Sequence, residues 1–141
     1  FSYLTANLEG LDGTPYGLQW TLFRSALTSD VGKGWSSPQL WMGHAAVTTP
    51  DAHFVTERLA RGGIGQAGVQ ADPFEAWIDD WQLVGPDFAT LTVTASGPDF
   101  AYDMVLNSDG FNGYAALSSA FCSLSSCSLT ARQAASIAPL R

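Results

Sequence analysis

Residues 41–49 have the sequence Trp41-Met-Gly-His-Ala-Ala-Val-Thr-Thr49 and lie between Pro38 and Pro50. Apolar and β-branched residues dominate this segment, and the prolines are typical of loops at its ends, so the segment predicts one strand. Side chains alternate between the two faces of a strand, and both faces are mostly apolar here. We therefore expect a strand that is buried on both sides. His44, the ionisable group in its middle, then needs a hydrogen-bond partner or a cavity.

Similar alternation recurs on both sides of this segment and predicts an all-β fold. Clusters of Gly, Asp and Pro separate the alternating segments, and no convincing amphipathic helix precedes residue 111. Consecutive hairpins favour an antiparallel up-and-down β-barrel, because closure removes exposed strand edges. Six or seven strands are fewer than the roughly eight of a barrel that holds a ligand, so we expect an incomplete barrel whose open edge is covered by the tail or by a second copy. The other alternating segments are 3–8, 16–24, 53–60 (which also fits a helical turn), 76–84, 88–95 and 99–106.

Length and charge limit the class of protein. The chain has 141 residues, enough for one domain with a sizeable core, and its net charge of −7 argues against nucleic acid and anionic membranes as partners. No apolar run approaches the roughly 20 residues of a membrane span, and strand-like sequence begins at Phe1 without a signal peptide. Cys122 and Cys127 have a spacing that fits no common zinc or redox motif. A local disulfide and two free thiols both stay open, and so does the compartment.

The last part of the chain differs in composition from the rest. Residues 111–141 contain no Trp and no acidic residue, and Ser and Ala dominate. Leu117, Phe121 and Leu124 keep a helical spacing, so a helix packed on the barrel and a disordered or artificial tail are both open. We therefore divide the chain into a β-domain at 1–110 and a tail at 111–141.

Two motifs suggest a cofactor or a metal, and their contexts argue against both. Gly63-Ile-Gly-Gln-Ala-Gly68 matches the dinucleotide pattern G-x-G-x-x-G, but Asp72-Pro73 interrupts the helix that must follow it, so a glycine-rich loop is favoured. His44 and His53 could share a metal with Asp51, but no further strong ligand has suitable spacing. We expect neither a cofactor nor a metal. No Ser-His-Asp or Cys-His arrangement is evident either.

Asp79 is the most conspicuous carboxylate of the sequence. Asp79 and Asp80 are adjacent in the segment 76–84, and on a strand they would point to opposite faces, so they could not act as a carboxylate pair. Asp79 shares its face with Trp77 and Trp81. If that face is interior, the carboxylate is either protonated or paired with an arginine, and an ion pair is favoured over catalysis. The available partners are Arg24, Arg58 and Arg61.

Four segments occur in an order that resembles the AttH-like, carotenoid 1,2-hydratase-related (hydroxyneurosporene synthase) family. The resemblance spans residues 3–109 and implies a lipocalin-like (calycin) barrel, often exported and often followed by a second such domain. It also implies a bulky apolar ligand of the isoprenoid kind. The segments are Tyr16-Gly-Leu-Gln-Trp-Thr-Leu-Phe-Arg24, Met42-Gly-His-Ala-Ala-Val-Thr-Thr49, Glu57-Arg-Leu-Ala-Arg61 and Trp77-Ile-Asp-Asp-Trp81. By motif position, the implied ligand-binding residues are Gln19, Arg24, His44, Arg58, Arg61, Asp79 and Trp81.

Two functions stay open. In the first, the chain is a binding module that holds an apolar small molecule in a barrel cavity, where tryptophans supply contact area and His44 donates a hydrogen bond to the ligand or to Asp79. In the second, it is a hydratase-type enzyme in which Asp79 protonates an isoprenoid double bond. The acidic Asp-Arg-Glu-Trp motif of the family is absent from this sequence, which therefore resembles the N-terminal half of a family member with an unrelated ending. Its absence favours binding.

Overall fold

The computed structural model describes residues 2–9, 13–29, 32–87, 90–108, 115–122 and 135–138. These residues form antiparallel strands and one short 3-10 helix, η1 (Gly34–Ser36), which confirms the predicted all-β class. No helix in the described ranges is long and apolar enough to cross a membrane. The strands are β1 (Ser2–Glu9), β2 (Pro15–Ala26), β3 (Gln39–Thr48), β4 (His53–Arg61), β5 (Ala67–Ala71), β6 (Phe74–Ile78), β7 (Trp81–Asp87), β8 (Thr90–Ser96), β9 (Ala101–Ser108), β10 (Ala115–Cys122) and β11 (Ala135–Ala138).

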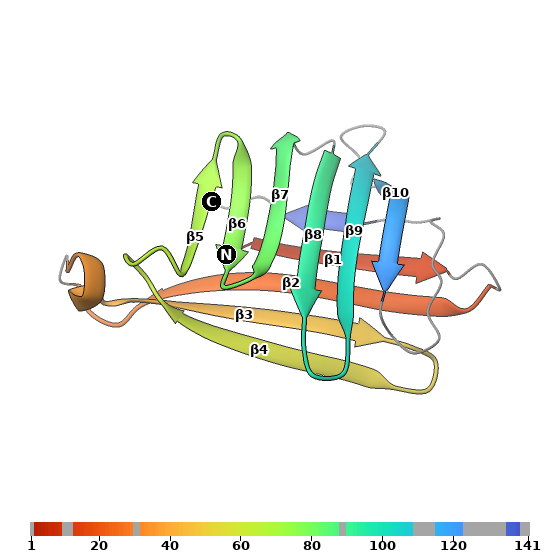
Figure 1. The fold of residues 1–141 in the computed structure, drawn as a ribbon, viewed down its shortest axis with the longest axis horizontal. Helices are drawn as coiled ribbons and strands as arrows, with labels where there is room; N and C mark the ends of the chain where they lie inside the picture. The colour runs from red at the N-terminus through yellow and green to blue at the C-terminus, as the bar shows by residue number, and fades with distance from the viewer. Residues whose placement is uncertain are drawn as a thin grey trace.

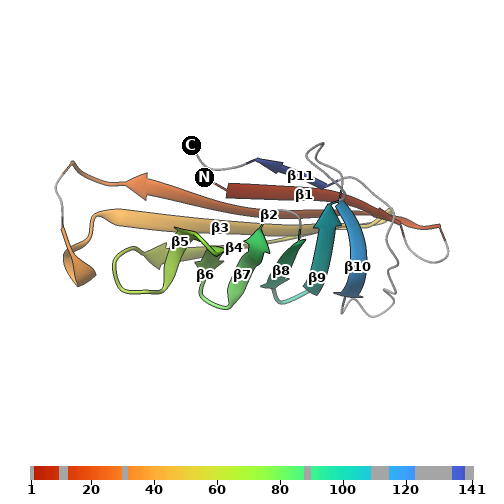
Figure 2. The ribbon, with the colours of Figure 1, turned by 90° about the horizontal axis from the view of Figure 1, so that it is seen from above.

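The strands form two open sheets that face each other, and not the incomplete up-and-down barrel that we expected. One sheet has five strands in the order β11-β1-β2-β3-β4, and the other has six in the order β10-β9-β8-β7-β6-β5. The long strands of the first sheet run across those of the second (Figures 1 and 2). Gly63 and Gly65, both with φ of +83°, lie in the turn between β4 and β5. Glycine adopts this conformation without strain, so the chain leaves one sheet here and enters the other.

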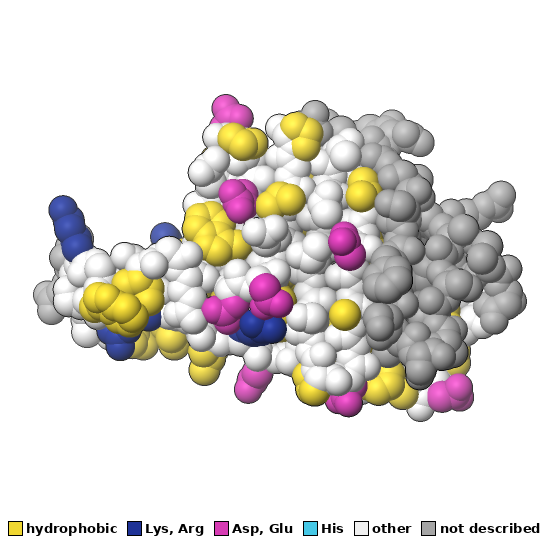
Figure 3. Space-filling model, in the orientation of Figure 1, with side chains coloured by type: hydrophobic (Ala, Val, Ile, Leu, Met, Phe, Trp, Pro, Cys, Tyr) yellow, Lys and Arg dark blue, Asp and Glu magenta, His cyan; other side chains and the backbone are white. Residues whose placement is uncertain are grey.

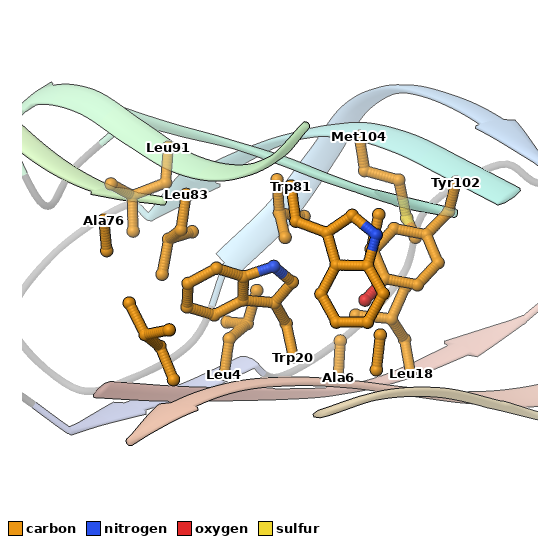
Figure 4. Packing of buried hydrophobic residues seen from close by; sticks show 14 of the residues in the cluster. Leu4, Ala6, Leu18, Trp20, Ala76, Trp81, Leu83, Leu91, Tyr102 and Met104 are labelled. Carbon is orange, nitrogen blue, oxygen red and sulfur yellow. The ribbon is translucent and has the colours of Figure 1, made fainter. Parts of the chain in front are cut away.

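The core lies between the two sheets and follows the two-residue alternation of the strands. On β2, Leu18 and Trp20 point inward and pair with Ala6 and Leu4 of β1. The six-stranded sheet contributes the facing side chains, which include the fully buried Trp81 (Figure 4). Burying each large apolar side chain stabilises the fold by about 1.5–3 kcal/mol, so the sheet pair is held chiefly by this layer.

The predicted strand over residues 76–84 is a hairpin. β6 ends at Ile78 and β7 begins at Trp81, and these two residues pair across a turn made of Asp79 and Asp80. Asp79 has φ of +53°, a left-handed conformation that Asp tolerates better than most residues.

The predicted glycine-rich loop is shorter than expected, because Gly68 belongs to β5. A Cβ atom added to Gly68 would come within 2.6 Å of the Trp77 ring.

Two segments of the Ser- and Ala-rich tail are strands, and one of them spans Leu117 and Phe121, where a helix was one of the two alternatives that we left open. β10 pairs with β9, and β11 pairs with β1. The tail thus adds an edge strand to each sheet, which is one of the two ways in which we expected an open edge to be covered. Cys127 and the side chain of Cys122, for which a disulfide and two free thiols were both open, lie outside the described residues.

Tyr102 of β9 links the two sheets with a buried hydrogen bond. Its hydroxyl donates to the backbone oxygen of Gln19 at 2.9 Å, and the residue is 2% exposed. Burial raises the pKa of the Tyr102 phenol above its usual value. Above about pH 10, Tyr102 ionises in the unfolded chain but stays protonated in the folded one, so folding becomes less favourable by up to about 1.4 kcal/mol per pH unit.

We therefore expect the stability difference between the native chain and Tyr102→Phe to depend on pH. Near neutral pH the native chain should be more stable by about 0.5–1.5 kcal/mol, because the substitution removes one hydrogen bond. This advantage should shrink and then reverse as the pH rises above about 10. Urea unfolding of both proteins at several pH values measures the effect, and parallel pH profiles would contradict it.

Candidate functional site

The structure separates the seven predicted site residues into three groups. One group lies where the two sheets meet, one lies on the outer face of the five-stranded sheet, and one lies at the end of that sheet near η1. These groups are Arg58 with Asp79 and Trp81, Gln19 with His44, and Arg24 with Arg61.

The first group forms the sheet-junction cluster, which we define as Arg58, Asp79, Asp80, Trp81 and Ser96. The Arg58 Nη1 atom lies 2.6 Å from Oδ1 of Asp80 and 3.4 Å from Oδ2 of Asp79, and the guanidinium carbon lies 4.9 Å from the centre of the Trp81 ring. The Ser96 backbone oxygen accepts hydrogen bonds from Trp81 Nε1 at 2.9 Å and from Arg58 Nη2 at 3.5 Å. One arginine of the five-stranded sheet therefore contacts both the β6–β7 turn and the end of β8 in the other sheet.

Gly43 gives the cluster its close packing. Gly43 is the β3 partner of Arg58, and a Cβ atom added to it would lie 2.8 Å from Ile78 Cγ2 and 3.3 Å from two Trp81 ring carbons. Only a residue without a side chain leaves room for Ile78 and Trp81 at this point. Trp81 is thereby fully buried next to Arg58, and its ring gives the guanidinium a cation–π partner.

The turn between β6 and β7 corrects our prediction about the two aspartates. Because Asp79 and Asp80 lie in a turn and not on a strand, both carboxylates reach Arg58. Gln66 also donates to Asp79 Oδ1 at 2.8 Å, and the Ser96 hydroxyl donates to Asp80 Oδ2 at 3.2 Å. The predicted ion pair between Asp79 and an arginine is present. Its carboxylate faces protein donors, an arrangement that gives no support to a role as the acid that protonates a substrate.

His44 lies on the outer face of the five-stranded sheet, so β3 is not buried on both sides as we expected. Its side chain is 41% exposed, with Nε2 3.9 Å from Oε2 of Glu57 and the ring 5.8 Å from that of Phe23. The inner face of β3 instead carries Gly43, Ala45 and Val47, which are buried. His44 therefore does not contact Asp79. Within the described residues, no group of three or more His, Cys, Asp and Glu side chains could hold a metal ion.

The exposure of His44 leads to a prediction about stability. Because Glu57, which lies opposite His44, is 78% exposed, their interaction is screened by solvent. We expect His44→Ala to change the free energy of unfolding by no more than about 0.5 kcal/mol. Urea unfolding near neutral pH tests this, and a loss of several times that size would show that His44 supports the core after all.

Trp20 is a functional candidate that our sequence reasoning missed. Its indole is fully buried between the sheets, and its Nε1 atom has no hydrogen-bond partner among the described residues. Figure 4 shows that this nitrogen faces the six-stranded sheet. The alternation of residues 16–24 places Trp20 on the inner face, but no sequence signal shows whether an acceptor lies opposite. A buried donor without an acceptor is unusual in a native fold.

Comparison with known proteins places the fold in a family. A family model described as AttH-like matches residues 1–119, most of the chain. The chain belongs to the AttH-like family. The crystal structure of a candidate AttH protein from Nitrosomonas europaea shares 26% sequence identity with this AttH-like chain, with a TM-score of 0.62. The match covers 80% of this chain and 36% of that protein, so the chain spans little more than a third of the solved relative.

The comparison confirms one part of the predicted relationship. The AttH-like resemblance is confirmed by the family model and by the solved structure. A comparison with curated proteins found no match. The relation of this AttH-like chain to the carotenoid 1,2-hydratases stays a prediction.

Proposed function

We propose that this AttH-like chain binds an elongated apolar small molecule between its two sheets. The observation that carries the proposal is the Nε1 atom of the buried Trp20, which has no hydrogen-bond partner among the described residues. Leaving a buried donor without an acceptor costs about 1–3 kcal/mol, and a carbonyl or hydroxyl oxygen of a ligand would remove that cost. The ligand is then apolar along most of its length, with a hydrogen-bond acceptor near Trp20.

The surroundings of Trp20 support the apolar character of this ligand. Leu4, Trp81 and Leu83 are at most 1% exposed and point into the same space between the sheets (Figure 4). Aromatic and aliphatic side chains of this kind line most small-molecule sites, where a few polar groups fix the orientation of the ligand. Because side chains fill this space, binding requires that the sheets separate locally. Open sheets allow such a movement at their edges more readily than a closed barrel does.

Isoprenoids are the first ligand class to test. This choice rests on the resemblance of the four sequence segments to carotenoid 1,2-hydratase-related proteins, which implies a bulky apolar ligand of the isoprenoid kind. Retinol and retinal offer an acceptor oxygen, whereas β-carotene is a hydrocarbon of the same chemical class. The comparison of these ligands separates the apolar contribution to binding from the hydrogen bond that we assign to Trp20.

Tryptophan fluorescence quenching by these ligands tests the proposal. We expect Trp20→Phe to weaken binding of retinol and retinal by roughly 3- to 10-fold, the loss of one hydrogen bond, and to leave binding of β-carotene almost unchanged. Trp77→Phe is the matched control, because Trp77 Nε1 already donates to the Gly65 backbone oxygen at 3.0 Å. Absence of saturable binding for every ligand, or equal affinities of the native chain and Trp20→Phe for the polar ligands, would overturn the proposal.

A further inference from the structure

The loop between β2 and β3 exposes two large apolar side chains. This loop and η1 lie at the end where β2 and β3 project beyond the six-stranded sheet (left in Figures 1 and 2). Leu27 is 68% exposed and Trp35 is 77% exposed. The other tryptophans of the chain are buried or half-buried. Exposing a tryptophan to water is costly unless a surface covers it, which is why such residues mark interaction sites.

Hydrogen bonds hold Trp35 in this exposed position. Arg61 Nη1 donates to the Trp35 backbone oxygen at 2.9 Å, and the backbone nitrogen of Leu27 donates to the oxygen of Pro38 at 2.9 Å. The backbone nitrogen of Ser37 donates to the oxygen of Gly34 at 3.0 Å, which closes η1. A side chain presented by a fixed backbone loses less conformational freedom when it binds than one on a mobile loop.

Positive charge gathers at the same end of an acidic protein. Four Lys and Arg residues lie in the described ranges; Arg58 is paired with two aspartates, and Arg24, Lys33 and Arg61 all lie at this end. In Figure 3, apart from one dark blue group beside magenta side chains near the centre, the dark blue side chains lie around the projecting end. The described residues at this end thus carry three positive groups, in a chain whose formal net charge is −7.

We propose that this loop end, defined as Arg24, Leu27, Lys33, Trp35 and Arg61, docks on an anionic lipid surface. Tryptophan and leucine enter the boundary between headgroups and acyl chains, while Lys and Arg contact lipid phosphates. An open hollow of about 470 Å³ beside Arg61, lined in part by Leu27 and Pro38, offers space for a headgroup. The net charge of the whole chain argues against anionic membranes as partners, but the local charge of the described residues at this end has the opposite sign. The rest of the chain, which is acidic and is repelled by anionic lipid, then faces away from the lipid surface.

Co-sedimentation with vesicles tests the proposal. We expect the native chain to bind vesicles of phosphatidylglycerol and phosphatidylcholine in equal parts, to bind pure phosphatidylcholine much more weakly, and to be released by high salt. Trp35→Ala and Lys33→Glu should each weaken binding roughly tenfold or more. Leu59→Ala is the matched control, because Leu59 is 60% exposed on the outer face of the five-stranded sheet, and it should bind like the native chain. Brominated lipids in the same vesicles should quench the fluorescence of Trp35, and this quenching should be absent in Trp35→Ala.

The opposite results would overturn the proposal. The proposal fails if the native chain does not bind the anionic vesicles, or if it binds both kinds of vesicle equally. It also fails if Trp35→Ala binds as well as the native chain, or if Leu59→Ala loses as much binding as Trp35→Ala. Light scattering that shows dimers dependent on Trp35 would assign this surface to a second copy of the chain and would also overturn it. Thermal unfolding of each variant verifies that the fold is intact, so a loss of binding is a property of the surface.

Discussion

Arg58→Ala should lower the free energy of unfolding by about 2–3 kcal/mol, because it removes several interactions of the sheet-junction cluster at once. Asp79 and Asp80 lose their shared cation, the Ser96 backbone oxygen loses one of its two donors, and the Trp81 ring loses its guanidinium partner. The Arg58 side chain is 28% exposed, so the cost should stay below that of breaking a fully buried ion pair. Urea unfolding followed by tryptophan fluorescence measures it.

Three variants separate the contributions to this cost. Arg58→Lys should recover only part of the stability, because an ammonium group cannot stack on Trp81 and contact both carboxylates with the same geometry. Asp79→Asn should cost about 1–2 kcal/mol and Asp80→Asn less than about 1 kcal/mol. Asp80 is closer to Arg58, but it is 63% exposed against 29% for Asp79, and we expect solvent screening to outweigh the shorter distance. Full rescue by Arg58→Lys would show that only charge matters at this position.

The alternation of polar and apolar residues was enough to predict most of the strands and much of the core. The segment 16–24 shows why: Leu18, Trp20 and Leu22 repeat at every second position, and all three are buried on the inner face of β2. Such a pattern is local, and a strand has only two faces, so the sequence predicts which residues share a face. It does not predict which of two faces becomes the interior. His44 illustrates this limit, because both faces of β3 are similar in hydrophobicity and the structure buries the one that carries Gly43.

The alternation of polar and apolar residues could not predict whether the sheets close into a barrel, nor which residues form the sheet-junction cluster. The two-residue turn at Asp79 and Asp80 shifts the phase of the alternation, so Trp81 shares the inner face with Ile78 and lies opposite the face of Trp77. Our prediction that Trp77 and Trp81 share one face was therefore wrong, because it assumed one continuous strand. Arg24, Arg58 and Arg61 were equivalent partners for Asp79 until the register placed Arg58 opposite Gly43, on the inner face of β4. Such contacts between distant segments are set by how the sheets pack and not by local propensity.

Gly43→Ala should lower the free energy of unfolding by about 2–3 kcal/mol, an effect as large as that of losing Arg58. The added Cβ atom would lie 2.8 Å from Ile78 Cγ2 and 3.3 Å from the Trp81 ring, closer than side chains approach without displacement. Both neighbours are fully buried in the core, so neither can move without disturbing the other sheet. In an uncrowded strand the same change would be stabilising by about 0.5–1 kcal/mol, because glycine loses more chain entropy on folding.

Gly17→Ala and a double-mutant cycle decide whether the cost comes from the approach of the sheets. Gly17 is also a strand glycine, but its added Cβ would lie 3.3 Å from Thr48, an exposed residue that can adjust, so we expect little change or a slight gain in stability. Ile78→Ala removes the Cγ2 atom, and the double variant Gly43→Ala with Ile78→Ala should lose at least about 1 kcal/mol less than the sum of the single variants. Equal effects of the two glycine substitutions, or additive losses in the cycle, would mean that the sheets do not meet at Gly43. In that case Trp81 would have room beside Arg58 without the glycine, and the geometry of the sheet-junction cluster would need another cause.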